Sequence, residues 1–414
     1  MIKLPELLAP AGTLDAFKTA ILYGADAIYA GLPGFSMRAR AKITVDEVKQ
    51  GIDLAHAAGK RVYLAFNLFA HEREYANMAR VSEMINYLAP DALIVADPGV
   101  MMWVRAHHPD MPIHISTQAN ICSAASVKFW ASAGAKLCVL AREVPFAEFR
   151  AIRAACPDTK LEIFVHGAMC MSYSGRCLLS NFITGRPSNR GACAQLCRWK
   201  YDVILRETES GIEMPIDEDS RGAYIMNSRD LCLMPHLAEI IDAGPDSLKI
   251  EGRNRSEYYV GMVTNAYRCA MDAYAVDPAH FDPAPFMAEL NKLETRGYTT
   301  AFFDGNLGAG AHDYETTRST SDWHAAGVVT AVDTDKITLE LRNELRANTD
   351  ITFVLPGVIG GATVHLNQII NAKNGDALQK MSAGQHNSIT IPRAWISAEN
   401  WEKIVPCVVA YQHK

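Results

Sequence analysis

The chain has 414 residues, a formal net charge of −6 and a pI near 6.1. This length allows two or three domains, and the acidic balance gives no support for nucleic-acid binding through bulk charge. No apolar run is long enough to span a membrane and residues 1–12 lack the pattern of a secretory signal, so we expect a cytoplasmic protein without a membrane partner.

Short apolar runs alternate with helical patterns from the start of the chain as far as Ile250. The predicted strands are Pro5–Leu8, Ala27–Ala30, Val62–Phe66, Ala92–Ala96, Ile113–Ser116, Leu137–Leu140, Glu162–Val165 and Ser247–Ile250. Helical patterns such as Leu14–Tyr23, Val45–Ala58 and Glu143–Ala155 separate most of them. This alternation predicts an α/β fold, a TIM-like (β/α)8 barrel of parallel strands. A doubly wound open sheet is the alternative, but no glycine fingerprint follows the first strand.

A long cysteine-rich insertion, about residues 168–235, separates the seventh predicted strand from the eighth. We place the barrel domain at residues 1–310, with helices predicted at Ser256–Tyr274 and Pro285–Arg296. Short alternating runs then fill residues 320–414, among them GVVTAV, KITLEL and SITIPR. These runs predict a small C-terminal antiparallel β-barrel.

The barrel prediction locates a candidate site, because active sites of this fold lie where the strands end. Polar and charged residues stand at most of the predicted strand ends. They are Asn67, Asp97, Gln118, Arg142, Glu143, His166, Glu251 and Arg253. We therefore expect Asn67, Gln118, His166 and Glu251 as catalytic candidates, and Arg142 and Arg253 as substrate-binding residues. The loop residues Arg38 and Arg40 are further candidates for binding an anion.

Most of these residues also have a structural explanation. A lone histidine such as His166 is often a hydrogen-bonded structural residue, and Glu143 can cap the helix that follows it. Glu251 and Arg253 can form a structural ion pair. Arg142 is more telling, since a charge at a barrel mouth needs a partner, which an anionic substrate would supply.

Four cysteines in the insertion, Cys170, Cys177, Cys193 and Cys197, have the spacing C-x6-C-x15-C-x3-C. All-cysteine sets of four bind structural zinc or an iron–sulfur cluster. Only the last pair has the short spacing of a zinc knuckle, which favours the cluster without excluding zinc. Cys232 can replace one ligand or simply pack. The remaining cysteines lie in apolar segments and fit a hydrophobic core: Cys122, Cys138, Cys156, Cys269 and Cys407.

Basic and aromatic residues alternate near the same cysteines. Arg190, Arg198 and Lys200 are the basic residues that we select as RNA-binding candidates, and Tyr173, Trp199 and Tyr201 accompany them. Single-stranded RNA requires such a mixture, for phosphate contacts and base stacking. An ordinary polar loop has the same composition, so both interpretations stay open.

The run EIFVHGAMCMSYSGRCLLS, together with PELLAPAG, ISTQAN, NSRDLCLM and SLKIEGR, resembles the collagenase-like peptidase family, U32. The resemblance covers essentially the whole chain. It implies oxygen-independent hydroxylation with a [4Fe–4S] cluster, for which Cys170, Cys177, Cys193 and Cys197 match the family's ligands. Three branches of the family act on a tRNA wobble uridine, on a ribosomal RNA cytidine and on a ubiquinone precursor.

The chain is most similar to the tRNA branch, through its C-x3-C pair followed by RWKY and its C-terminal barrel. This similarity implies hydroxylation of wobble uridine at C5, with prephenate as a small anionic co-substrate and tRNA as the partner. A redox partner is possible. Prephenate is a dicarboxylate, which suits bidentate pairing with an arginine.

Two other classes of function stay open. The family name implies a peptidase, although the sequence contains no Ser/His/Asp order and no HExxH motif. The other class is a non-catalytic RNA-binding or scaffold protein with structural zinc.

Overall fold

The computed structural model describes most of the chain, with gaps concentrated in the cysteine-rich insertion. The described residues are 2–35, 43–170, 172–174, 176–186, 188, 193–198, 204–206, 213–215, 228–305, 321–384 and 386–414. Arg38, Arg40, Arg190 and Lys200 lie outside these ranges, and Arg198 is described only as part of a short 3-10 turn.

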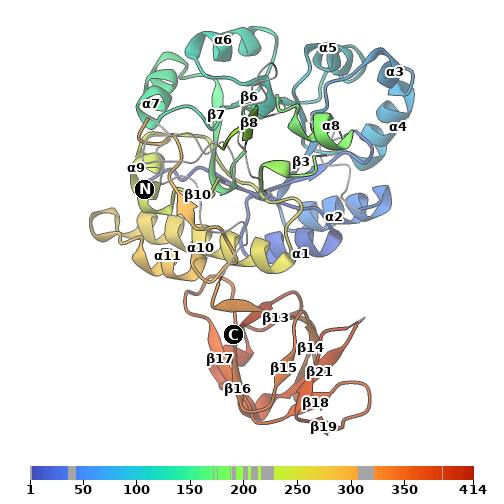
Figure 1. The fold of residues 1–414 in the computed structure, drawn as a ribbon, viewed down its shortest axis with the longest axis vertical. Coiled ribbons are helices and arrows are strands. Elements are labelled where there is room, and N and C mark those ends of the chain that lie inside the picture. The colour runs from blue at the N-terminus through green and yellow to red at the C-terminus, as the bar shows by residue number, and fades with distance from the viewer. Residues whose placement is uncertain are drawn as a thin grey trace.

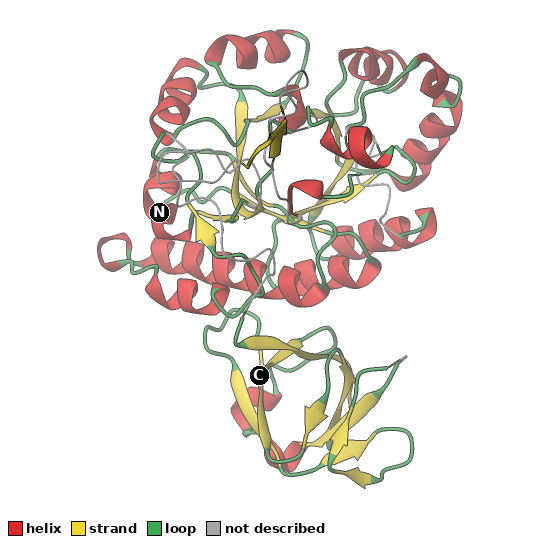
Figure 2. Ribbon diagram, viewed as in Figure 1, coloured by secondary structure: helices red, strands yellow, loops and turns green. Residues whose placement is uncertain are grey.

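Eight parallel strands close into a barrel, as the sequence predicts (Figures 1 and 2). The strands are β1 (Glu6–Pro10), β2 (Ala27–Gly31), β3 (Arg61–Phe66), β4 (Ala92–Val95), β5 (Ile113–Ile115), β6 (Leu137–Val139), β7 (Lys160–Ala168) and β11 (Ser247–Ile250). Each strand pairs in parallel with the next, and β11 pairs with both β1 and β7, which closes the ring. The predicted TIM-like fold is confirmed.

Helices cover the outside of the barrel (Figure 2). The barrel-domain helices are α1 (Leu14–Leu22), α2 (Val45–Ala57), α3 (Glu72–Tyr75), α4 (Met78–Leu88), α5 (Pro98–His107), α6 (Ala124–Ser132), α7 (Phe146–Ala155), α9 (Leu237–Asp242), α10 (Glu257–Val276) and α11 (Ala284–Leu290). Helix α7 begins at Phe146 and not at the predicted Glu143, since Pro145 occupies its N-cap in an extended conformation. Glu143 therefore lies in the loop that follows β6.

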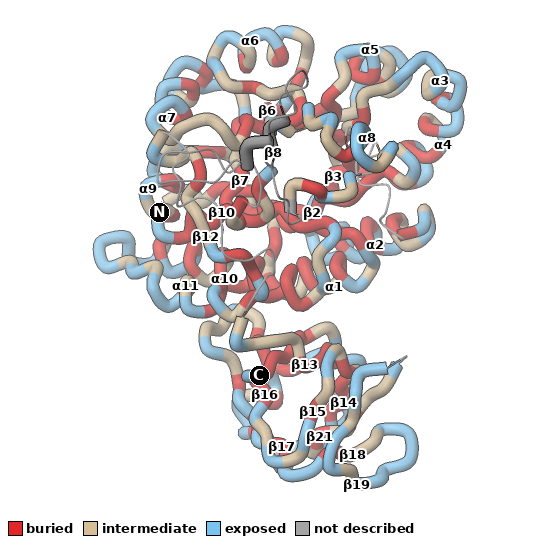
Figure 3. The backbone as a smooth tube through the Cα atoms, viewed as in Figure 1, coloured by how far each residue is buried: buried red, intermediate tan, exposed pale blue. Residues whose placement is uncertain are grey.

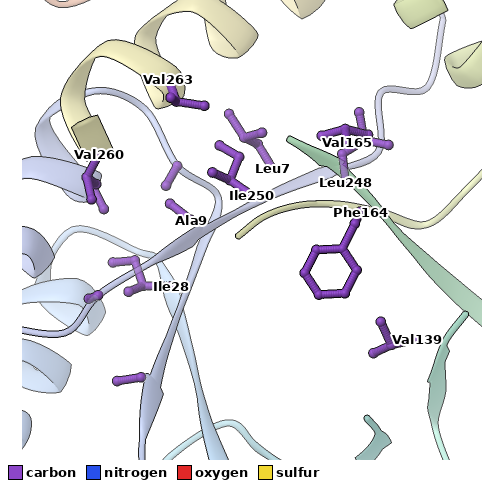
Figure 4. Close-up of a cluster of buried hydrophobic side chains, with 14 of the residues drawn as sticks. Leu7, Ala9, Ile28, Val139, Phe164, Val165, Leu248, Ile250, Val260 and Val263 are labelled. Atoms are coloured by element: carbon purple, nitrogen blue, oxygen red, sulfur yellow. The ribbon is translucent and has the colours of Figure 1, made fainter. Parts of the chain in front are cut away.

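The main hydrophobic core lies between the strands and this layer of helices (Figure 3). Figure 4 shows Leu7 and Ile250 of the barrel wall near Val263 of α10, while Val139 and Phe164 lie away from α10. Helix α10 is buried along most of its length, which anchors the first and last barrel strands to each other. Burial of this apolar surface is the main driving force for closing the barrel.

The barrel carries two extra strands beside β7. Strand β10 (Asp230–Cys232) pairs with β7 in antiparallel orientation, and β12 (Tyr298–Thr299) pairs with β10. Between β7 and β10, the insertion contains helix α8 (Leu179–Thr184) and the short pair β8 (Ile204–Arg206) and β9 (Glu213–Pro215). The insertion thus leaves the barrel after β7 and returns through an antiparallel partner of the same strand.

The C-terminal part has its own hydrophobic core and a curled antiparallel sheet. Its sheet contains β13 (Trp323–Val332), β14 (Lys336–Leu341), β16 (Thr349–Phe353), β17 (Ala362–Leu366), β18 (Ile369–Asn371), β19 (Ala377–Leu378), β21 (Ser388–Pro392) and β22 (Val409–His413). The sheet forms a half-barrel, since the two edge strands β17 and β19 do not pair with each other within the described residues. Figure 1 places it below α1, α10 and α11.

Buried hydrogen bonds attach the half-barrel to these helices. The Tyr23 hydroxyl of α1 donates to the Val354 carbonyl at 2.7 Å and accepts from the Val409 N–H at 3.0 Å. Asn265 of α10 donates to the Val358 carbonyl at 2.9 Å and accepts from the Gly357 N–H at 2.9 Å. None of the described helices combines the length and apolar character needed to cross a membrane.

Candidate active site at the barrel mouth

A cavity opens at the carboxyl ends of the barrel strands, where the sequence predicts a site. Its empty volume is about 560 Å³, part of which is open to solvent. The lining residues are Tyr29, Ala65, Asn67, Ile94, Ser116, Thr117, Gln118, Val139, Arg142, Phe164, Ser174, Lys249, Glu251 and Arg253. The structure thus brings together Asn67, Gln118, Arg142, Glu251 and Arg253 from the ends of four different strands. Their catalytic or binding roles stay predictions.

Amide and hydroxyl groups form one side of the cavity. The Asn67 amide donates to Ser116 Oγ at 3.4 Å, and that hydroxyl donates to Gln118 Oε1 at 3.3 Å. Gln118 is 2% exposed, and its Nε2 has no hydrogen-bond partner among the described residues. A buried amide donor without a partner costs free energy, so a ligand carbonyl or anionic oxygen that accepts from Gln118 would be stabilised.

Arg142 lies at the rim of the cavity and is held by the end of β7. Its Nη1 donates to the Ala168 carbonyl at 2.7 Å, and its guanidinium lies 4.1 Å from the centre of the Phe164 ring. Its buried Nε has no hydrogen-bond partner within the described chain. The side chain is therefore oriented by the scaffold while part of its donor capacity is unused.

Glu251 and Arg253 reach the cavity because two glycines let their backbone approach the neighbouring segments. A Cβ atom on Gly167 would lie 2.5 Å from the Glu251 carbonyl oxygen, and Gly167 has a φ of +113°. A Cβ atom on Gly12 would lie 1.8 Å from the Arg253 carbonyl oxygen. Larger residues at these glycines would displace the loop after β11, and with it both charged side chains.

Lys249 is a charged residue of this cavity that the sequence analysis did not select. Its Nζ lies 2.7 Å from Glu162 Oε1, and the two side chains are 5% and 1% exposed. The same ammonium lies 4.4 Å from the centre of the Tyr29 ring. Alternation along β7 and β11 points both residues inward. Glu162 pairs with Ser247 and Lys249 pairs with Phe164, so two opposite charges on the inner faces of adjacent strands, two positions apart, could have revealed the pair.

His166 does not line the cavity, which corrects its predicted place among the residues of the barrel mouth. It is 1% exposed and packs between the rings of Tyr259, Tyr267 and Tyr298, at centroid distances of 6.0, 5.7 and 5.3 Å. Neither ring nitrogen has a hydrogen-bond partner among the described residues. Burial, with a smaller contribution from Arg255, lowers the pKa of His166 to about 3, so the ring is neutral near pH 7.

A β-bulge explains the position of His166. Phe164 pairs with Lys249, but the next pair is His166 with Ile250, so Val165 is an extra residue in β7. Such an insertion reverses the alternation of side chains beyond it. His166 consequently points to the outside of the barrel with Ile250, and not inward with Phe164.

The four cysteines of the insertion all lie outside the barrel core. Cys170 and Cys193 are exposed, and Cys177 and Cys197 are half-buried. Two hydrogen bonds hold the segments around them together. Ser180 of α8 accepts from the Ala194 N–H, next to Cys193, at 2.9 Å, and Ser188 donates to the Cys177 carbonyl. The Gln195 N–H lies 3.3 Å from the Cys193 sulfur, the kind of N–H···S contact that stabilises a thiolate or a cluster sulfur.

These cysteines supply the right donor chemistry for a soft metal, but their side chains do not converge in the described structure. Among the described residues, no group of three or more His, Cys, Asp or Glu side chains is arranged to hold a metal ion. The donor set fits a four-cysteine cluster by residue type and by its loop setting.

Cys232, the alternative ligand, lies in the hydrophobic core on β10. Its sulfur is 3.9 Å from the Tyr267 hydroxyl and 3.6 Å from the Met287 sulfur. Burial raises the pKa of the Cys232 thiol to about 11, which disfavours the thiolate that a metal requires. The described structure therefore favours Cys197 over Cys232 as the fourth ligand.

Comparison with known proteins identifies the family. The sequence pattern of peptidase family U32 matches residues 12–313, most of the barrel domain. The chain belongs to peptidase family U32. A member from Escherichia coli, tRNA hydroxylation protein P, is 40% identical over 357 residues, which cover 77% of this chain and 78% of the relative.

Two further relatives show the range of this family. The tRNA hydroxylation protein P1 of Bacillus subtilis is 36% identical over 360 residues, covering 86% of this chain and 85% of the relative. The 23S rRNA 5-hydroxycytidine C2501 synthase of Escherichia coli is 34% identical over 314 residues, covering 75% of this chain and 46% of the relative. Within the described residues, no histidine or cysteine lines the mouth cavity of this U32 chain.

Proposed function

We propose that this U32 protein hydroxylates wobble uridine of tRNA at C5 without molecular oxygen. The names of its most similar relatives support an RNA substrate, and the two named for tRNA match this chain over most of both lengths. The observation that carries the proposal within the structure is the polar cavity at the barrel mouth, where five predicted residues gather. A wobble base belongs to a loop, so turning it into such a cavity costs little unpairing energy.

The cavity has groups that suit a uracil base beside a small anion. Gln118 Nε2, which has no partner among the described residues, can donate to a uracil carbonyl, and Asn67 is linked to Gln118 through Ser116. Arg142 and Arg253 would bind the carboxylates of prephenate, the co-substrate implied by the family branch. Glu251 is the acidic side chain among the lining residues, and we propose it as the group that accepts or returns a proton.

A [4Fe–4S] cluster on Cys170, Cys177, Cys193 and Cys197 completes this proposal. When bound, such a cluster supplies one-electron redox chemistry or an iron that binds a ligand. Support comes from the loop position of the four cysteines and from the burial of Cys138, Cys156 and Cys232 in the core. The arginines and lysine of the insertion, Arg190, Arg198 and Lys200, are proposed to contact RNA phosphates, and an external redox partner would restore the cluster's electrons.

The decisive experiment is mass spectrometry of tRNA nucleosides from a deletion strain grown without oxygen. We expect loss of 5-oxyuridine derivatives and their return with the wild-type gene. Complementation with the Arg142→Ala gene should give a normal level of the protein. The modified nucleoside should return to less than about a tenth of its wild-type level, because one charge-assisted contact to the anion is lost. A matched control is Arg105→Ala, on α5 and outside the cavity, which should restore full modification.

The same strain tests the second candidate, ribosomal RNA. The relative named for 23S rRNA hydroxycytidine favours it, although this chain spans less than half of that protein. Normal tRNA 5-oxyuridine with missing ribosomal hydroxycytidine would move the assignment to ribosomal RNA. Normal levels of both nucleosides would overturn the proposed function.

A further inference from the structure

The floor of the mouth cavity contains a buried ion pair that the proposed function does not use. Lys249 of β11 and Glu162 of β7 lie side by side inside the barrel, with Nζ and Oε1 2.7 Å apart. The Ser247 hydroxyl donates to the other Glu162 oxygen at 3.0 Å. The interior of a TIM-like barrel is normally filled by layers of apolar side chains, so full charges at this depth need an explanation.

Stability does not provide that explanation. Removing two charges from water costs several kcal/mol per ion, roughly as much as their attraction returns, and a hydrophobic pair of similar size is often at least as stable. The residues around this pair are compatible with an apolar replacement, since Tyr29, Phe164 and Val139 all line the same space. We therefore explain this buried ion pair by function: one of its two residues binds a ligand in the cavity.

The geometry of the lysine identifies that member. An ammonium has three N–H donors, and in the part of the chain that the structure describes the only hydrogen bond of Lys249 Nζ goes to Glu162. The Nζ atom lies 4.4 Å from the Tyr29 ring centre and 5.6 Å from the Phe164 ring centre, and both rings border the cavity. Ring faces stabilise a cation but accept hydrogen bonds weakly, so donor capacity remains for a ligand.

The charges of the cavity point to the ligand's chemistry. Among the described lining residues, Arg142, Lys249 and Arg253 carry positive charge and Glu251 alone carries a carboxylate. Glu162 lies behind Lys249 and balances its charge without occupying the cavity face. Lys249 lies within β11 and is 4% exposed, whereas Arg142 follows the end of β6 and is half-buried, so the two cations stand at different depths along the barrel.

We infer that Lys249 is the floor anchor for one carboxylate of a dicarboxylate co-substrate, whose other carboxylate binds at the rim near Arg142. Glu162 acts as a positioning residue, which holds the lysine against the cavity wall. This two-depth arrangement selects dicarboxylates over monocarboxylates, because a single carboxylate leaves one cation without a partner. The inference rests on the proposed function only for the identity of the co-substrate, prephenate.

The main test is calorimetric titration of the full-length protein, purified without oxygen, with prephenate, phenylpyruvate and inorganic phosphate. Wild type should bind the dicarboxylate prephenate at least about tenfold more tightly than the monocarboxylate phenylpyruvate. The double variant Lys249→Met/Glu162→Gln removes both charges together and leaves no unpaired buried ion. It should bind prephenate roughly 10- to 100-fold more weakly, and the preference over phenylpyruvate should disappear.

Two controls separate a lost anchor from a damaged fold. Lys160→Met removes a lysine from the exposed start of β7, at the other end of the barrel, and should bind like wild type. Lys249→Arg keeps the charge and should recover part of the dicarboxylate preference, which a merely structural defect would not. Iron content and the melting temperature of each variant are measured in the same preparations.

Each outcome decides the inference. Prephenate binding by the double variant equal to that of wild type overturns it, and so does phosphate binding that is as tight as prephenate binding. If wild type binds prephenate and the double variant does not, the floor anchor is supported. This holds even if tRNA from the deletion strain is normal, in which case only the proposed RNA substrate fails. Absence of prephenate binding in wild type, with tRNA modification intact, overturns the anchor and leaves the RNA hydroxylation in place.

Discussion

The buried charged and titratable side chains of this barrel differ in whether they have a partner that balances their charge or shares a hydrogen bond with them. Lys249 and Glu162 compensate each other, while His166 is buried among aromatic rings without a hydrogen-bond partner in the described chain. An unsatisfied buried ring nitrogen is costly, and protonating it there is costlier still. His166 on β7 is therefore a buried residue whose lowered pKa gives the stability of the protein a measurable dependence on pH.

We predict that His166→Phe weakens the acid sensitivity of the protein. The folded state holds the pKa of His166 near 3, below the ordinary value of 6.5, so the unfolded chain takes up the proton first. The stability associated with the neutral ring is complete above pH 6.5 and falls as the pH drops toward 3, by about 1.4 kcal/mol per pH unit at most. Urea denaturation at pH 7.5 and pH 5.5 should show a smaller stability difference in the variant.

A matched control for this experiment is His280→Phe, because the His280 side chain is 83% exposed. It should keep the wild-type dependence on pH. His166→Phe should also retain hydroxylation activity, since His166 lies outside the cavity. A variant that is stable but inactive would restore His166 as a catalytic candidate.

At the scale of elements, the strand ends were predictable and the details of β7 were not. Apolar runs bounded by turns located the barrel strands, and parallel strands must present their carboxyl ends on one face, so Asn67, Gln118 and Arg142 met as expected. The bulge at Val165 depends on pairing with β11, far away in sequence, and no local pattern marks it. Lys249 was missed because its apolar neighbours Leu248 and Ile250 made the strand look uniformly buried.

The insertion between β7 and β10 leads to a prediction about metal ligands. Cys197→Ala should lose most of the iron and the visible absorption of protein purified without oxygen, because one of four thiolate ligands is absent. Cys232→Ala should keep both, since that sulfur contacts Tyr267 and Met287 in the core. Iron and sulfide analysis checks the result. Loss of iron in Cys232→Ala with retention in Cys197→Ala would reverse the choice of fourth ligand.

On the scale of the whole molecule, the half-barrel is joined to the barrel by buried polar contacts from two helices as well as by the chain itself. Tyr23 and Asn265 come from α1 and α10, and both bond to backbone groups of the half-barrel. Figure 1 shows the half-barrel on the side of the barrel that these helices cover.

We predict that Tyr23→Phe loosens this attachment. The Tyr23 ring is 1% exposed, and its hydroxyl satisfies both the Val354 carbonyl and the Val409 N–H. The phenylalanine ring would fill the same space but leave those backbone groups unpaired, at a cost of about 1–3 kcal/mol. Urea denaturation should show the loss of stability, and amide hydrogen exchange should rise at Val409 on β22.

Tyr87→Phe, which removes an exposed hydroxyl bonded to Asp46 within the barrel domain, is the matched control and should change neither measurement. Equal exchange at Val409 in wild type and Tyr23→Phe would mean that the Tyr23 hydroxyl does not help to hold the half-barrel in place.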